Sequence, residues 1–173
     1  MRLWTMLLPG HSEEDAPEVT VNTPLADGDY FMGIKLSLAG AQLRMKVALT
    51  ADGTAGKGGK LLTLDMYGLG TNDDWISEAP IASVSDIEVK ADGSFTADLG
   101  KVTVPAKSSP TGSPVGASLT LVGTIDSATN SFCGGLLGDI PDFKADIAGS
   151  TFKAVPFGQE TDPYQVSCKT QAV

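Results

Sequence analysis

The chain of 173 residues contains a single histidine, His11, which lies in a polar, acidic segment near the N-terminus. Histidine-based triads and multi-histidine metal sites need imidazoles within the folded body of a protein. The sequence also lacks the Gly-x-Ser-x-Gly and Ser-x-x-Lys motifs of serine nucleophiles. These absences predict a protein that is not an enzyme, with no catalytic residues, no bound metal and no cofactor.

Positive charge is scarce as well. The net charge is −9, and the two arginines, Arg2 and Arg44, are accompanied by lysines that occur singly along the chain. Binding to a phosphate backbone needs a clustered basic face, so nucleic acid is excluded as a partner. Residues 1–29 hold six acidic residues and one basic residue, which makes most of the negative charge a property of a solvated leader.

No stretch approaches the roughly 20 apolar residues of a membrane-spanning helix. The longest apolar run lies at the N-terminus, where both faces of an extended strand would be apolar. An exposed run of this kind tends to pair with another sheet. It is interpreted as an assembly arm or as the remnant of a targeting segment, with these candidate residues: Leu3, Trp4, Met6, Leu7 and Leu8.

Cysteine is limited to Cys133 and Cys168, whose spacing fits neither a Cys-x-x-Cys motif nor a metal site. The pair is predicted to form a disulfide that ties the C-terminal tail back to the body, the alternative being two unrelated buried thiols. Because disulfides persist in oxidising compartments, the pair favours an extracytoplasmic location, secreted or at the cell surface.

Helical periodicity is absent, and a period of two dominates from Tyr30 onward. Short strands separated by turn signals every 8–12 residues are typical of an all-β sandwich or barrel. We expect one antiparallel up-and-down β-barrel, or a sandwich, of about 8–10 strands. The predicted organisation is an apolar arm and acidic linker over 1–28, a β domain over 29–157 and a tail over 158–173.

The apolar face of these strands could fill the barrel or line a ligand cavity. A carrier would need an apolar cavity of at least about 300 Å³. The candidate cavity residues are Tyr30, Met32, Met45, Met66, Phe95 and Phe132.

Two acidic loops contain residues that could contact a ligand. Asp73, Asp74 and Trp75 lie on the longest internal connection and could contact a sugar, or could belong to an ordinary solvated loop. Asp139, Asp142 and Asp146 could contribute to a calcium site, although their spacing follows no calcium-loop pattern and favours the capping of turns.

Four segments carry a resemblance to known proteins: Asp27-Gly-Asp-Tyr-Phe31, Ala91–Leu99, Ser131-Phe-Cys-Gly134 and Ala148–Val155. They resemble β-rich domains of secreted or surface-attached bacterial proteins that have no assigned activity. The strand pattern is also similar to lipocalin-like carriers, whose Gly-x-Trp motif is replaced here by Gly28-Asp29-Tyr30.

These observations together predict a non-catalytic structural or interaction module at a bacterial surface that self-assembles through its N-terminal arm. Its expected partners are further copies of itself or another envelope protein. The alternative is a lipocalin-like carrier of a small apolar ligand, and a third reading is a β-barrel enzyme without histidine chemistry.

Overall fold

A computed structural model describes residues 24–38, 41–54, 56–70 and 75–168. These residues form nine antiparallel strands and no α-helix. The strands are β1 (Gly28–Lys35), β2 (Gln42–Thr54), β3 (Gly58–Gly68), β4 (Ala82–Val89), β5 (Ser94–Val104), β6 (Val115–Asp126), β7 (Ser131–Ile140), β8 (Ala145–Asp146) and β9 (Ser150–Pro156). The all-β prediction is therefore confirmed.

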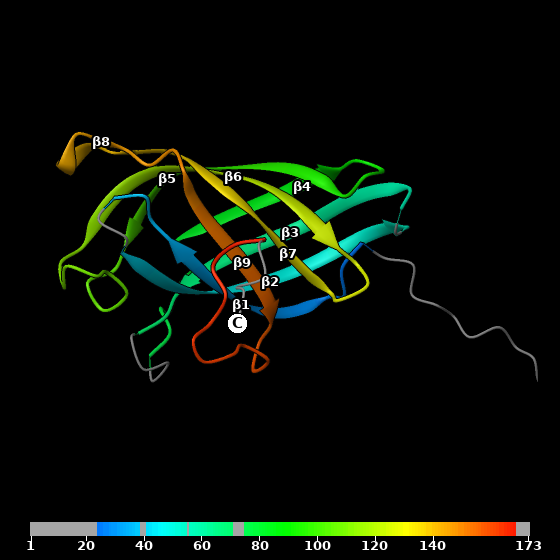
Figure 1. The fold of residues 1–173 in the computed structure, drawn as a ribbon, viewed down its shortest axis with the longest axis horizontal. Coiled ribbons are helices and arrows are strands. Elements are labelled where there is room, and N and C mark those ends of the chain that lie inside the picture. The colour runs from blue at the N-terminus through cyan, green and yellow to red at the C-terminus, as the bar shows by residue number, and fades with distance from the viewer. Residues whose placement is uncertain (1–23, 39–40, 55, 71–74, 169–173) are drawn as a thin grey trace, which may run out of the picture.

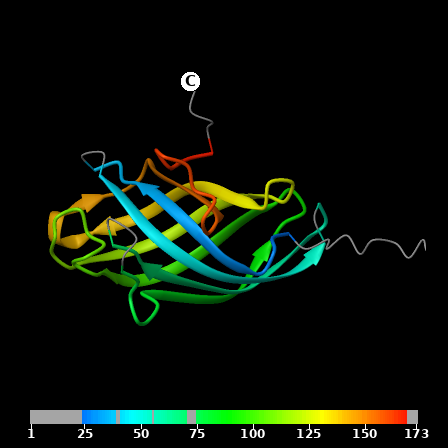
Figure 2. The same cartoon turned by 90° about the horizontal axis from the view of Figure 1, so that it is seen from below.

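The sheet closes on itself. Each strand from β1 to β7 pairs with the next along the chain, and β9 pairs with both β7 and β1. Eight strands thus form an up-and-down barrel, to which β8 adds a short extension beside the end of β7 (Figures 1 and 2). The structure selects the barrel over the sandwich.

The segment between β7 and β9 contains little regular strand. Residues Pro141–Phe143 form a 3₁₀ turn, η2, which ends at Lys144 with a left-handed φ of 49°, and β8 spans two residues. Pro141 has no N–H to donate to a ladder, and the reversal at Lys144 ends the turn, so regular pairing is confined to Ala145 and Asp146.

One seam of the barrel is weakly paired. The ladder between β4 and β5 consists of Val89 opposite Phe95, whereas β5 and β6 pair over almost their full lengths. Asp86 of β4 has a φ of 55°, and the register of β5 shifts between Asp98 and Gly100. Irregularities of this kind change the direction of a strand, and here the pairing between β4 and β5 does not continue beyond their hairpin.

Alternate side chains point into the barrel and form one core. On β2 the inward residues are Leu43, Met45, Val47 and Leu49, and the same alternation holds along β6 from Val115 to Ile125. The register between neighbouring strands places their inward side chains beside each other, with Met32 opposite Met45 and Ile34 opposite Leu43.

Aromatic rings fill the half of the barrel nearest the β2–β3, β4–β5 and β6–β7 turns, which we call the closed end. Phe132 lies at the centre of this cluster, and its ring makes edge contacts with Tyr30, Phe95 and Phe152 at centroid distances of 5.6, 6.1 and 6.1 Å. Gly123 faces Phe95 across the ladder, where a Cβ would lie 2.8 Å from that ring. Glycine is required there so that the aromatic ring fits.

The hydroxyl of Tyr30 completes the closed end. It donates to the carbonyl of Ala26 at 2.6 Å and contacts Oδ1 of Asn130 at 2.9 Å, an atom that also accepts from the N–H of Ala26. Burial raises the pKa of Tyr30, an effect that the hydrogen bond with Asn130 opposes and the charge of Asp27 reinforces. The neutral phenol therefore joins the entering chain to the β6–β7 turn.

A C-terminal strap, residues 157–168, crosses the outer face of the barrel over β9 and β1 (Figure 1). The ring of Tyr164 makes an edge contact with Phe31, and the guanidinium of Arg44 lies 5.3 Å and 5.1 Å from these two ring centroids. A Cβ on Gly33 would lie 2.5 Å from the Tyr164 ring. The strap covers Phe31, an outward side chain that is nevertheless 1% exposed.

Cys133 on β7 and Cys168 at the end of the strap form a disulfide, with their Cα atoms 5.1 Å apart. The predicted pairing of the two cysteines is thereby confirmed. The bond fixes the end of the strap to the outer face of the sheet, next to strand β9.

We expect the stability of the protein to fall above pH 10 because of Tyr30. A pKa raised in the folded state means that the phenol stabilises the fold below its unfolded pKa of 10.0 and that this contribution is lost as pH rises through the folded pKa. Tyr30→Phe should cost about 1–2 kcal/mol at pH 7 through the lost hydrogen bonds. The difference in denaturant midpoint between the two proteins should narrow above pH 10, and a constant difference would contradict the assignment.

Replacing both cysteines by serine should lower the free energy of unfolding by about 3–4 kcal/mol, since the closed loop spans 35 residues. Urea denaturation of the oxidised protein, the reduced protein and the double variant measures the effect. Reduction should bring the unchanged chain to the midpoint of the variant and leave the variant itself unaffected. A midpoint insensitive to reduction would show that the disulfide adds nothing to stability.

Candidate functional site: an apolar cavity at one mouth of the barrel

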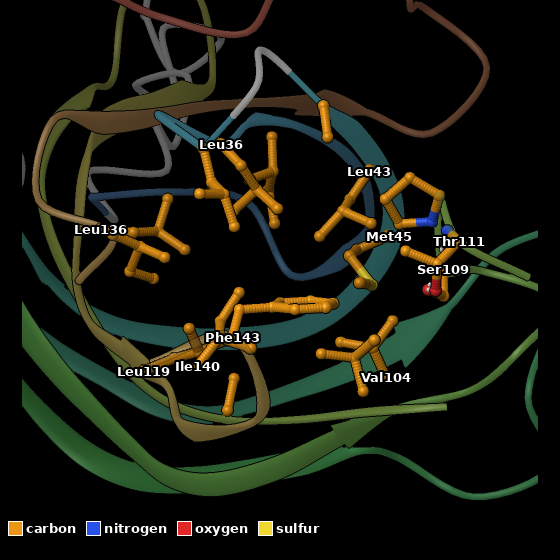
Figure 3. Close-up of a pocket in the computed structure, with 17 residues that line it drawn as sticks. Leu36, Leu43, Met45, Val104, Ser109, Thr111, Leu119, Leu136, Ile140 and Phe143 are labelled. Carbon is orange, nitrogen blue, oxygen red and sulfur yellow. Dashed lines mark hydrogen bonds between the residues drawn. The ribbon is translucent and has the colours of Figure 1, made fainter. Parts of the chain in front are cut away.

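A cavity of about 180 Å³ lies at the end of the barrel opposite the aromatic cluster. This cavity end is formed by the β1–β2, β5–β6 and β7–β9 connections, and Figure 3 shows side chains converging on the space from these elements. Its lining residues are Ile34, Leu36, Leu38, Ala41, Leu43, Met45, Val104, Ser109, Pro110, Thr111, Val115, Ala117, Leu119, Leu136, Ile140, Phe143 and Ile147.

The inward strand residues around this space are aliphatic rather than aromatic, and the smallest of them lie on β5 and β6. The last residue of β5 and the first inward residues of β6 are Val104, Val115 and Ala117, and Val104 lies directly opposite Val115. At the closed end, by contrast, the inward side chains include the aromatic rings of Tyr30, Phe95 and Phe132. An eight-stranded barrel is just wide enough to be filled by its side chains, so small residues leave room.

None of the described residues that line the cavity carries a charge. The two hydroxyls, on Ser109 and Thr111, hydrogen-bond to each other at 2.9 Å, and Ser109 also accepts from the N–H of Thr111. A cavity lined in this way offers water few partners and is of the kind that stays dry or takes an apolar ligand. The lining contains no group able to act as a general acid or base.

Several residues that line the cavity are exposed to solvent, among them two large apolar side chains. Leu38 after β1 is 36% exposed and Phe143 on η2 is 48% exposed, and both line the space. In Figure 3 the ring of Phe143 extends from its own wall toward Met45 and Val104.

Of the six residues predicted to line a cavity, Met45 does so. Tyr30, Phe95 and Phe132 belong to the aromatic cluster that fills the closed end, and Met32 and Met66 are buried in the core between the two ends. The residues missed were mainly aliphatic. Side-chain size in the sequence could have indicated this end of the barrel, because the inward residues nearest the β5–β6 connection are small.

The predicted acidic loop is described in part. Asp73 and Asp74 lie outside the described residues, as does the proposed arm with Leu3, Trp4, Met6, Leu7 and Leu8. Trp75 is described, and the ammonium of Lys107 lies 5.2 Å from its ring centroid, a cation–π contact. Its carbonyl also accepts from the N–H of Gly70, so this residue is held against the β5–β6 loop and the end of β3.

Two of the three aspartates predicted as possible calcium ligands lie in the β7–β8 ladder, and Asp142 lies in η2. Asp139 and Asp146 face each other in the β7–β8 ladder, and Oδ1 of Asp146 accepts from the N–H of Ala148 at 2.6 Å. Within the described residues, no group of three or more His, Cys, Asp or Glu side chains is arranged to hold a metal ion.

Sequence reasoning did not anticipate the outer site around Arg44. Its guanidinium lies within cation–π distance of the Phe31 and Tyr164 rings and borders a hollow of about 230 Å³ together with Gln42 and Ser108. This hollow lies outside the barrel and shares Ser109 and Pro110 with the apolar cavity, so the β5–β6 loop forms a wall of both.

Searches of protein-family models, of curated proteins and of solved structures found no match to this chain. Among the described residues, no helix has the length and apolar character needed to cross a membrane. The function must therefore be argued from the cavity itself.

Proposed function

We propose that the protein binds a small apolar molecule, or the apolar part of a larger amphiphile, in the cavity at the mouth of the barrel. The observation that carries the proposal is an uncharged cavity of about 180 Å³ that opens to the surface at one end of an otherwise filled barrel. The filled closed end supports it further, because a rigid scaffold keeps such a space from collapsing.

The volume limits the ligand. It is smaller than the roughly 300 Å³ of a site for a drug-sized molecule. An engineered cavity of about 150 Å³ with a similar lining binds benzene. The occupant is therefore of the size of one aromatic ring or a chain of about six carbons, and any polar remainder lies in water beyond Leu38 and Phe143.

The affinity should be modest. Burying six methylene groups at about 0.8 kcal/mol each yields about 5 kcal/mol, which corresponds to a dissociation constant of about 0.2 mM. A tighter complex would need contacts between the rest of the ligand and the mouth.

The disulfide supports placing the protein in an oxidising, extracytoplasmic compartment. Self-assembly through residues 1–10 and a surface-module role stay predictions, because that segment lies outside the described residues.

The proposal is tested by titrating 1-hexanol into the protein and into Ala117→Leu, followed by calorimetry and by NMR of the methyl groups. Ala117 lines the cavity, so three added carbon atoms would occupy much of it. We expect binding near 0.2 mM for the unchanged chain and a loss of at least about tenfold in the variant, in line with the apolar contacts displaced.

Ala128→Leu, an exposed position in the β6–β7 turn at the closed end, is the matched control and should bind as the unchanged chain does. Equal binding by all three proteins would place the alcohol elsewhere and refute the proposal.

A further inference from the structure

The segment from Pro141 to Ile147, which we call the lip, runs beside the mouth of the cavity and contributes Phe143 and Ile147 to its lining. Both ends of the lip are anchored in the core, since Ile140 just before it and Ile147 are buried. Between these anchors no residue of η2 is buried. The lip is thus a short loop held at its two ends.

Backbone hydrogen bonds hold the lip in place. The N–H of Lys144 donates to the carbonyl of Pro141, the N–H of Ile147 donates to the carbonyl of Gly138, and the β8 ladder adds two residue pairs. Oδ1 of Asp146 also accepts from the N–H of Ala148. The lip is therefore a bonded turn whose side chains, apart from Ile147, stay outside the core.

The opposite side of the mouth is tied down more firmly. In the β5–β6 loop the N–H groups of Ser108 and Ser109 donate to Pro105, and the hydroxyls of Ser109 and Thr111 bond to each other and to the local backbone. Ser108 and Ser109 are both buried. The β5–β6 loop is thus a well-bonded side of the mouth.

Phe143 is the large side chain that the lip presents to the cavity. One part of its ring lines the space and the rest, 48% of the residue, contacts water. A half-exposed phenylalanine in a turn that buries nothing else gains little for folding, yet its ring extends over the cavity toward Met45 and Val104 (Figure 3).

We infer that Phe143 is the residue that determines ligand length: its ring closes the exit of the cavity and limits the number of carbon atoms that the protein can bury. The inference rests on the proposed function of the cavity. It names linear aliphatic chains with an uncharged or solvent-facing head as the ligand class, because none of the described lining residues could pair with a buried charge.

The test compares affinities for a series of primary alcohols from 1-butanol to 1-decanol. Each methylene that is buried should tighten binding about fourfold, the equivalent of about 0.8 kcal/mol. For the unchanged protein the gain should stop near six carbons. In Phe143→Ala it should continue for two or three more carbons, so that 1-decanol binds this variant at least about tenfold more tightly than it binds the unchanged protein.

Phe157→Ala is the matched control, since Phe157 follows β9 at the far end of the barrel, is similarly exposed, and does not line the cavity. It should reproduce the chain-length profile of the unchanged protein. Phe143→Leu serves as a milder second variant, for which an intermediate profile is expected, and circular dichroism and the urea midpoint establish that each protein is folded.

The outcomes separate the two proposals. Alcohols that bind all folded variants with one and the same chain-length limit would overturn the role of Phe143 and leave the cavity proposal standing. Absence of alcohol binding by the unchanged protein and by both Phe143 variants would overturn the proposed function, and the inference with it.

Discussion

Closure of the sheet through the pairing of β9 with both β1 and β7 is the constraint on which the rest of the structure depends. Once eight strands close, the width of the interior is set by strand number and tilt, and every inward side chain shares one space. Side-chain size along each strand then decides where that space is filled. The rings around Phe132 fill one half, aided by Gly123, whereas Val104, Val115 and Ala117 leave the other half partly empty.

Much of the fold follows from the period of two, because alternation alone indicates which residues face inward. Leu43, Met45 and Val47 illustrate this: their inward orientation needs no knowledge of other strands. The position of the cavity needs more. Val104 and Val115 are eleven residues apart in the chain and become opposite through the β5–β6 register, and Met45 joins them through closure of the barrel. A register between strands is a long-range property that a single sequence does not display.

Phe31 shows a second limit of the pattern. Alternation assigns it to the outer, wet face together with Lys35, yet it is buried. The strap accounts for this burial, since Tyr164 and the guanidinium of Arg44 both contact the Phe31 ring. Gly33, which has no side chain, leaves room for the strap to approach. Strand β1 is consequently enclosed on both faces at the strand pair that closes the barrel. The pairing of the two cysteines could be predicted from the sequence, but the surface that the strap between β9 and Cys168 covers could not.

The character of the cavity bears on how any ligand would be selected. Hydrophobic contacts discriminate between ligands that differ by one methylene by only about 1–3 kcal/mol, whereas unpaired polar groups discriminate far more strongly. Since the hydroxyls of Ser109 and Thr111 already bond to each other, the lining has few free polar groups with which to distinguish one ligand from another. Selectivity must then come from length and shape, which are set by the walls. Among those walls, the lip presents Phe143, a large side chain that borders both the cavity and the solvent. A side chain at that boundary is well placed to decide how long a molecule can be buried.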